Sequence, residues 1–350
     1  MSLAARVSRE TMSEWLRDDR GSLKHLRGSG TWMVTGNVRG TRPRDGGGVV
    51  VKIFPEGTVI DETSVYDHKI HPMREGKHLF VQPLAIVDTS LSDEDKLERV
   101  LKEHMKTDKV RLLVMERIDG DTLENFLKDE TVASEEKVVA LIQLLDALCI
   151  MRKNKITHND LHFKNVMVRN ASKDARNLGD SVYSVLGIRL RTDKEVKVFD
   201  WDKSIVDGLV GDTRDYNPSY DLVSVMVRLN EASLIDPLLL ETREVLREAF
   251  EPLFSRYTMT FKEFAGTEHL VCERRAPHFA EATSSGCCES VDEDVEKFLE
   301  ETPEWCVDNR GWPPTVHTLI PRIKKLQLLI LQRVLKIEVP LIEYLEALYI

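Results

Sequence analysis

The sequence predicts an α+β protein in which a strand-rich N-terminal part precedes a larger helical part. Short apolar and β-branched runs, bounded by glycine or proline, fill the first third of the chain and are typical of strands. After about residue 120, apolar residues recur with the 3.6-residue period of a buried helix. A chain of 350 residues has room for two domains, which we expect at residues 1–117 and 118–350.

Composition and charge argue against several classes of protein. Apolar residues make up 42% of the chain and charged residues 31%, so the chain can bury a sizeable core. The formal net charge of −10 argues against binding to a nucleic-acid backbone. The chain starts without the apolar run of a secretory signal, the most apolar window (residues 319–339) is interrupted by charges, and the five cysteines are odd in number. We therefore expect a cytoplasmic protein with no membrane and no nucleic-acid partner.

Three strands are expected in the N-terminal part, at residues 49–54, 79–87 and 110–118. They are rich in β-branched and apolar residues and are bounded by turn residues. Residues 61–70 are expected to form a short helix that ends before Pro72. Apolar spacing between Leu97 and Met105 indicates a surface helix between the last two strands.

The C-terminal part is expected to begin with a long buried helix that includes residues 138–148. Shorter segments follow, with strands at 165–168 and 196–200 and strand-like residues at 182–190. From Tyr220 onward the pattern is mostly helical. Residues 319–335 are expected to form a core helix that ends near Pro340.

The strongest motif is His-Asn-Asp-Leu-His-Phe-Lys-Asn, residues 158–165, which follows the long helix and leads into a strand. A carboxylate and an amide five residues apart in one loop can serve two purposes. Asp160 can accept the proton of an attacking hydroxyl, and Asn165 can bind a magnesium ion between phosphates. The alternative is a polar turn in which Asp160 acts only as a cap.

A second motif is Val-Lys-Val-Phe-Asp-Trp-Asp, residues 196–202, where an apolar strand ends in carboxylates. Residues two apart on a strand point to the same side. Asp200 and Asp202 can therefore face one cation if the extended conformation continues through Trp201. The alternative is a strand that ends in solvated acids.

Two weaker features lie in the N-terminal part. Lys52 is in an apolar strand and needs an anion if it is buried; Glu62 suits this role, with Glu75 as a competitor. The alternative is that Lys52 extends to solvent from an edge strand. The glycines of Gly28-Ser29-Gly30 let the backbone approach phosphates, although a simple hairpin turn would also explain them.

The order of these features along the chain resembles the signature set of the protein-kinase-like superfamily, over about residues 23–229. The resemblance implies a bilobal protein-kinase-like fold with a small antiparallel-sheet N-lobe and a larger helical C-lobe. It also implies ATP as a partner and Mg²⁺, or Mn²⁺ in its place, as the metal.

The resemblance further implies roles for individual residues. Lys52 binds the α and β phosphates of ATP, Glu62 orients Lys52, and Asp160 is the base. The remaining roles are metal binding by Asn165, Asp200 and Asp202, phosphate binding by Gly28, Ser29 and Gly30, adenine binding by the backbone of a hinge at Glu116 and Ile118, and bracing of the catalytic loop by Asp221.

Several residues depart from the pattern of the family. Asn159 stands where an arginine usually precedes the base, so we expect no switch by phosphorylation of an activation loop. His162 stands where a lysine is usual, and Lys164 is then the cation that can reach the transferred phosphate. The other departures are Met33 in place of a third glycine, Asp202 in place of the glycine after the metal-binding aspartate, and the lack of an Ala-Pro-Glu motif.

Two branches of the superfamily share the wording of these motifs. His-Asn-Asp-Leu and Asp-Trp-Asp are similar to choline and aminoglycoside kinases. Together with the long insertion at 169–195, they also resemble the divergent serine/threonine kinases of large DNA viruses, which would act in the host cytoplasm; the insertion favours this second branch. The expected function is transfer of the γ-phosphate of ATP to serine or threonine of a protein substrate. The alternatives are a kinase for a small hydroxylated molecule and a pseudokinase that only binds partners.

Overall fold

The computed structural model describes residues 23–25, 32–36, 49–55, 62–91, 99, 102–103, 106–171, 182–206, 220–231, 236–254 and 316–339. The chain divides into two compact units, Met1–Gly120 and Asp121–Ile350. Helices are combined with antiparallel strands, so the protein is of the α+β class that the sequence predicts. Among the described residues, no helix is both long and apolar enough to cross a membrane.

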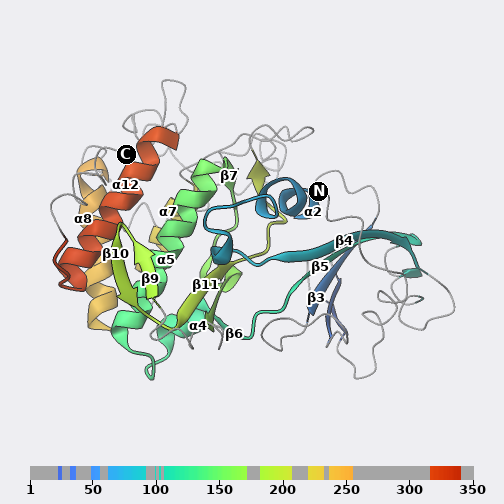
Figure 1. Ribbon diagram of the computed structural model, residues 1–350, viewed down its shortest axis with the longest axis horizontal. Helices are drawn as coiled ribbons and strands as arrows, with labels where there is room; N and C mark the ends of the chain where they lie inside the picture. Colours follow the sequence, from blue (N-terminus) through green and yellow to red (C-terminus); the bar gives the residue numbers. More distant parts are fainter. Residues whose placement is uncertain are drawn as a thin grey trace, which may run out of the picture. The chain divides into compact units, whose positions relative to one another are not determined.

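The N-terminal unit is built on a five-stranded antiparallel sheet (Figure 1). In spatial order its strands are β1 (Leu23–His25), β2 (Trp32–Gly36), β3 (Val49–Pro55), β5 (Lys109–Glu116) and β4 (Pro83–Ser90). β3 lies in the middle, and its side chains Val51, Ile53 and Phe54 are buried, as a strand covered on both faces requires. The strands expected at 49–54 and 110–118 are present, and the second ends at Glu116.

A short helical segment follows β3 along the chain. α2 (Glu62–Val65) runs directly into a π-helical turn at Tyr66–Ile70, and the segment ends before Pro72, as expected. Its buried residues Val65, Tyr66 and Ile70 belong to the core of this unit. The helix expected between Leu97 and Met105 lies mostly outside the described residues.

The strand expected at residues 79–87 begins only at Pro83. Lys77–Leu79 form a 3-10 turn instead. The side-chain amide of Gln82 donates to the carbonyls of Lys77 and Phe80 at 2.7 and 2.8 Å. These bonds satisfy carbonyls that would otherwise need partners in a ladder, so the turn competes successfully with the strand.

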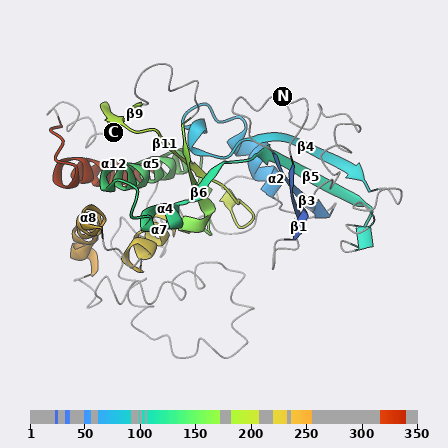
Figure 2. The same ribbon diagram turned by 90° about the horizontal axis from the view of Figure 1, so that it is seen from below.

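The C-terminal unit has a helical core around α5 (Ser134–Lys153), which is buried along most of its length. Its other helices are α7 (Tyr220–Glu231), α8 (Pro237–Phe254) and α12 (Val316–Leu329), which continues as a π-helical turn at Ile330–Val334. α5 packs against α8 and α12 (Figure 2). The core helix expected at residues 319–335 is confirmed, and the chain leaves it at Lys336, with a φ of 55°, before Pro340.

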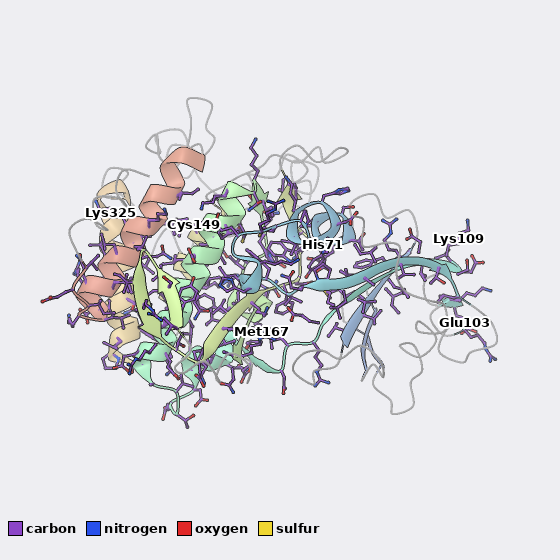
Figure 3. The ribbon with its side chains drawn as sticks, viewed as in Figure 1. His71, Glu103, Lys109, Cys149, Met167 and Lys325 are labelled. Carbon is purple, nitrogen blue, oxygen red and sulfur yellow. The ribbon has the colours of Figure 1, made fainter. Side chains whose placement is uncertain are left out.

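Cys149 lies in α5 within this helical core (Figure 3). The thiol is buried and forms no disulfide. Burial raises the pKa of Cys149 to about 12, so the thiol stays protonated and unreactive. The other four cysteines lie outside the described residues.

Short strands complete the C-terminal unit. β6 (Gly120–Thr122), β8 (Val166–Asn170) and β11 (Lys194–Val198) form one sheet in the order β11-β8-β6. Two antiparallel pairs are formed by β7 (Ile156–Thr157) with β12 (Ile205–Val206) and by β9 (Val182–Val185) with β10 (Ile188–Arg191). The strand-like insertion is therefore confirmed as a hairpin. The strand expected at 165–168 begins at Val166, and the strand expected to reach residue 200 ends at Val198.

Candidate functional site

The strand lysine of the N-terminal unit forms a buried ion pair. Lys52 Nζ lies 2.5 Å from Glu62 Oε2, and the two residues are 5% and 1% exposed. Charges removed from water in this way are tolerated only as a well-formed pair. β3 is an inner strand, so the edge-strand interpretation of Lys52 is wrong. Glu62, rather than the exposed Glu75, is the partner.

The residues after β5 belong to the same unit. Glu116 N–H donates to the Gln82 carbonyl at 3.1 Å, and Glu116 Oε1 accepts from Gln82 N–H at 2.9 Å. Among the described residues, none makes a hydrogen bond with the backbone of Ile118. Gly28, Ser29 and Gly30 lie outside the described residues.

In the C-terminal unit, Asp160 and Asn165 lie in one closed loop. The loop joins β7 to β8 through a 3-10 turn at Phe163–Asn165. Asn165 Nδ2 donates to the Asp160 carbonyl at 3.0 Å and so closes the loop. Asn159 has a φ of 61°, in the left-handed region that asparagine tolerates better than most residues. The structure therefore brings the predicted base and the predicted metal ligand together.

Asp200 reaches the same loop through the β8–β11 ladder. Val198 lies opposite Val166, and one residue further on Phe199 N–H donates to the Asn165 carbonyl at 3.1 Å. Asp200 is the next residue along the chain. Backbone hydrogen bonding therefore places Asp200 directly after Phe199, the residue that is bonded to Asn165.

The structure corrects the prediction that Asp200 and Asp202 share one face of a strand. The strand ends at Val198, Asp200 has a φ of 71°, and Asp202 lies in a turn. Trp201 between them is buried, and Ser204 donates to its carbonyl from N–H at 3.1 Å and from Oγ at 2.5 Å. The buried indole and the closed turn take the chain out of the extended conformation.

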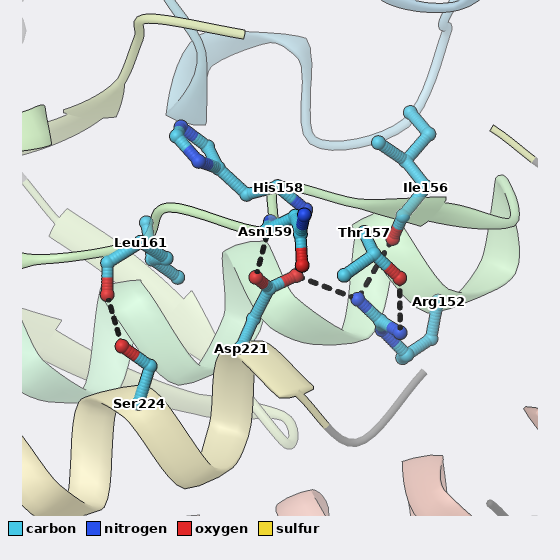
Figure 4. A network of polar contacts seen from close by, with 8 residues as sticks. All are labelled: Arg152, Ile156, Thr157, His158, Asn159, Leu161, Asp221 and Ser224. Atoms are coloured by element: carbon cyan, nitrogen blue, oxygen red, sulfur yellow. Dashed lines mark hydrogen bonds and ion pairs between the residues drawn. The ribbon is translucent and has the colours of Figure 1, made fainter. Parts of the chain in front are cut away.

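A buried carboxylate braces the loop from α7 (Figure 4). Asp221 Oδ2 accepts from His158 N–H at 2.8 Å, and Oδ1 accepts from Asn159 N–H at 3.0 Å. The same Oδ2 pairs with Arg152 at 2.8 Å, and both side chains are buried. Arg152 also donates to the Ile156 carbonyl at 2.7 Å. The network fixes the backbone on the approach to Asp160, which is the bracing expected of Asp221.

Two further contacts hold the loop. Ser224 Oγ donates to the Leu161 carbonyl at 2.7 Å (Figure 4). His158 Nε2 donates to the Phe199 carbonyl at 2.8 Å, and its ring lies 4.8 Å from that of Trp201. His158 is fully buried, so it packs beneath the loop and ties it to the segment that carries Asp200.

Two lysines carry positive charge near the loop. Lys203 Nζ lies 2.8 Å from Asp160 Oδ2, with side chains that are 59% and 28% exposed. Lys164 is exposed, and its Nζ lies 3.5 Å from Glu124 Oε2 on α4 (Leu123–Lys128). The cation bonded to the predicted base is therefore Lys203, whereas Lys164 is paired with Glu124 on α4.

Sequence reasoning misses Arg152 and Lys203. Arg152 is a charged residue at the end of a buried helix, a position that calls for a buried partner. Lys203 directly follows the Asp-Trp-Asp motif, and only the turn at Trp201 directs it back to Asp160. The need of Arg152 for a buried partner could be predicted from the sequence, whereas the contact of Lys203 with Asp160 depends on the turn.

Asn165 and Asp200 carry side-chain oxygens that the sequence predicts as ligands of a divalent cation. Because Asn165 Nδ2 is bonded to the Asp160 carbonyl, Oδ1 is the amide atom left for a cation. Amide and carboxylate oxygens are hard ligands of the kind Mg²⁺ prefers, and Mg²⁺ usually combines one or two carboxylates with phosphate and water. In the part of the chain that the structure describes, no group of three or more His, Cys, Asp and Glu side chains could hold a metal ion. One amide and one carboxylate oxygen form a donor set that fits a metal whose other ligands are phosphate and water.

No protein-family model and no curated protein sequence matches the chain. Among solved structures, the chain is similar to the Rad53 kinase domain and SCD2 in complex with AMPPNP, with 14% sequence identity and a TM-score of 0.28. The match covers 54% of this chain and 53% of that chain, so it spans about half the length of each.

Proposed function

We propose that the protein is an ATP-dependent phosphotransferase that transfers the γ-phosphate to a hydroxyl group, with serine or threonine of a protein as the acceptor. The observation that carries the proposal is the closed loop of the C-terminal unit. It holds Asp160 and Asn165 together, it is tied by ladder bonds to the segment before Asp200, and a buried carboxylate braces it from below. A polar turn capped by Asp160 would need none of these long-range bonds.

The chemistry assigned to this loop is transfer from ATP to an acceptor oxygen. The oxygen attacks the γ-phosphorus, the bond from that phosphorus to the bridging oxygen breaks, and ADP leaves. Asp160 receives the proton of the hydroxyl. Asn165 and Asp200 would hold Mg²⁺, which would neutralise charge on the phosphates, with Asp202 as a further acid nearby. Lys164 would supply positive charge to the transferred group.

The nucleotide contacts of the proposal come also from the N-terminal unit. Lys52, oriented by Glu62, would bind the α and β phosphates. The backbone of Ile118, next to Glu116, would bind adenine, and the glycines at residues 28 and 30 would approach the phosphates. A buried lysine that already has a carboxylate partner is held in one orientation, which suits a phosphate contact.

Asp160→Asn tests the proposal because it keeps the shape of the side chain and removes the base. Purified protein is incubated with labelled ATP and Mg²⁺, with casein, a basic protein, amino alcohols and aminoglycosides offered in parallel. We expect label on protein and a loss of roughly 10²- to 10⁴-fold in the variant. Binding of a fluorescent ATP analogue should change by no more than about twofold, because the phosphate and metal ligands remain.

Asp88→Asn is the matched control, since Asp88 is an exposed aspartate paired with Arg111. It should leave transfer unchanged. Label on a small molecule would replace the protein acceptor by the alternative, a small-molecule kinase. No label on any acceptor, or an Asp160→Asn variant as active as the wild type, would reject the proposed mechanism and favour a binding module.

A further inference from the structure

The carboxylate of Asp160 has one side-chain partner among the described residues, and that partner is Lys203. Lys203 Nζ donates to Asp160 Oδ2 at 2.8 Å. The second carboxylate oxygen, Oδ1, makes no hydrogen bond with the described residues. A general base needs one oxygen presented to the acceptor hydroxyl and a carboxylate group that does not rotate away.

The backbone that carries Lys203 is fixed on both sides. On one side, Ser204 closes the turn with two bonds to the carbonyl of the buried Trp201. On the other side, β12 pairs with β7, with Ile205 opposite Thr157, just before the loop of Asp160. The lysine therefore starts from an anchored turn, and its reach to Asp160 follows from the fold.

We propose that Lys203 is a positioning residue of the transfer site: by holding Asp160 Oδ2 it leaves Oδ1 as the oxygen that receives the proton of the acceptor. This inference rests on the proposed function. The residue acts through Asp160, so its loss should lower the rate of the chemical step more than the affinity for the nucleotide.

A lysine ammonium is positively charged at neutral pH, so Lys203 brings a full positive charge to Asp160 Oδ2.

A second ion pair in the same unit provides a matched comparison. Lys128 Nζ lies 2.7 Å from Glu124 Oε1, with side chains that are 54% and 29% exposed, almost the values of the Lys203 pair. Pairs with this exposure add little to stability. The two lysines should therefore be equivalent in unfolding experiments and differ only in their effect on turnover.

The experiment compares Lys203→Ala, Lys203→Arg and Lys128→Ala in the full chain, with labelled transfer to the accepted substrate as the assay. We expect Lys203→Ala to lower kcat by about 100-fold and to change KM for ATP by less than about threefold. Lys203→Arg should recover most of kcat because it keeps a cation at the same place. Lys128→Ala should match the wild type, and all three melting temperatures should lie within about 2 °C of it.

Chemical rescue separates positioning by charge from a structural role. Propylammonium added to Lys203→Ala should restore part of the lost kcat, and it should restore nothing in Asp160→Asn. A Lys203→Ala enzyme within about threefold of wild-type kcat would overturn the inference and leave the proposed function standing. A loss that propylammonium and arginine both fail to recover would also overturn it. Equal turnover by Asp160→Asn and the wild type would reject the proposed function itself, and this inference with it.

Discussion

Two ion pairs hold the loop around Asp160, and they differ in burial while having the same length. Arg152 and Asp221 are 2.8 Å apart with side chains 1% and 0% exposed. Lys203 and Asp160 are also 2.8 Å apart, with side chains 59% and 28% exposed. The buried pair bonds to the backbone of the loop, whereas the exposed pair bonds to one side chain on it. The distance within an ion pair therefore does not show whether the pair holds the backbone of the loop or a single side chain on it.

The energetic consequences of the two pairs follow from their solvent exposure. Removing one member of a buried pair leaves a charge in a medium that cannot solvate it, at a cost of about 3–5 kcal/mol. An exposed pair exchanges one solvated state for another and is worth about 0.2–1 kcal/mol. The buried pair therefore contributes more to the stability of the loop, and the exposed pair can orient the predicted base, Asp160, at little cost in stability.

The largest effect on stability is expected from Asp221→Ala. The change removes the acceptor of two backbone N–H groups and leaves the Arg152 charge buried without its partner. The free energy of unfolding should fall by about 3–5 kcal/mol, measured by urea denaturation. Glu241→Ala, which removes the exposed partner of Lys336, is the control and should cost less than about 1 kcal/mol. A similar small loss in both variants would contradict the contrast between buried and exposed pairs.

A smaller loss is expected from Ser224→Ala. Ser224 is buried and donates to the Leu161 carbonyl, so the change leaves that acceptor without this donor. The free energy of unfolding should fall by about 1–3 kcal/mol. Hydrogen exchange of the amides in the loop should rise with it, because the bond lies under the loop. An unchanged urea midpoint would mean that the Ser224 hydrogen bond adds nothing measurable to the stability of the loop.

The smallest effect concerns pH and involves His162, a half-buried residue of the same loop. Burial lowers the pKa of His162 below its ordinary value of 6.5, and the charge of Arg228 lowers it further, against the opposing charge of Asp160. In the window from 6.5 down to this lowered pKa, the unfolded chain binds more protons than the folded chain. Stability should therefore fall as the pH falls through that window.

Urea midpoints at about pH 7.5 and about pH 5.5 measure this dependence. Because other groups titrate in the same range, His162→Gln is the comparison. The variant should lose less stability on acidification than the wild type does. An identical loss in both proteins would show that His162 contributes nothing to it.

The N-terminal unit shows how far the sequence leads. The apolar run around Lys52 predicts a strand, and a buried lysine requires a carboxylate, so Glu62 was within reach of prediction. The competition between Glu62 and Glu75 could not be decided, because it depends on which side of a helical segment faces the sheet. The strand expected at residue 79 was displaced by a turn that the Gln82 side chain closes, and no pattern of apolar residues reports such a bond.

The C-terminal unit shows which features could not be predicted from the sequence. The spacing of Asp160 and Asn165 identifies the loop, and the apolar strand before Asp200 identifies the second segment. Extrapolating that strand through Asp202 was wrong, because a buried indole outweighs the local preference for extended backbone. Asp202 and Lys203 lie in a turn instead of a strand, and from this turn Lys203 reaches Asp160.

Local patterns in this sequence determined the central strands of the N-terminal sheet, the place of the long helix and the loop that carries the predicted base, since these depend on neighbours a few residues away. The tertiary structure alone decided the two charge pairs that hold the loop around Asp160. Arg152 and Asp221 are 69 positions apart, and Lys203 and Asp160 are 43 positions apart. Pairs at such separations form only after helices and ladders have packed, because burial and backbone hydrogen bonding then leave each charged group few places to go.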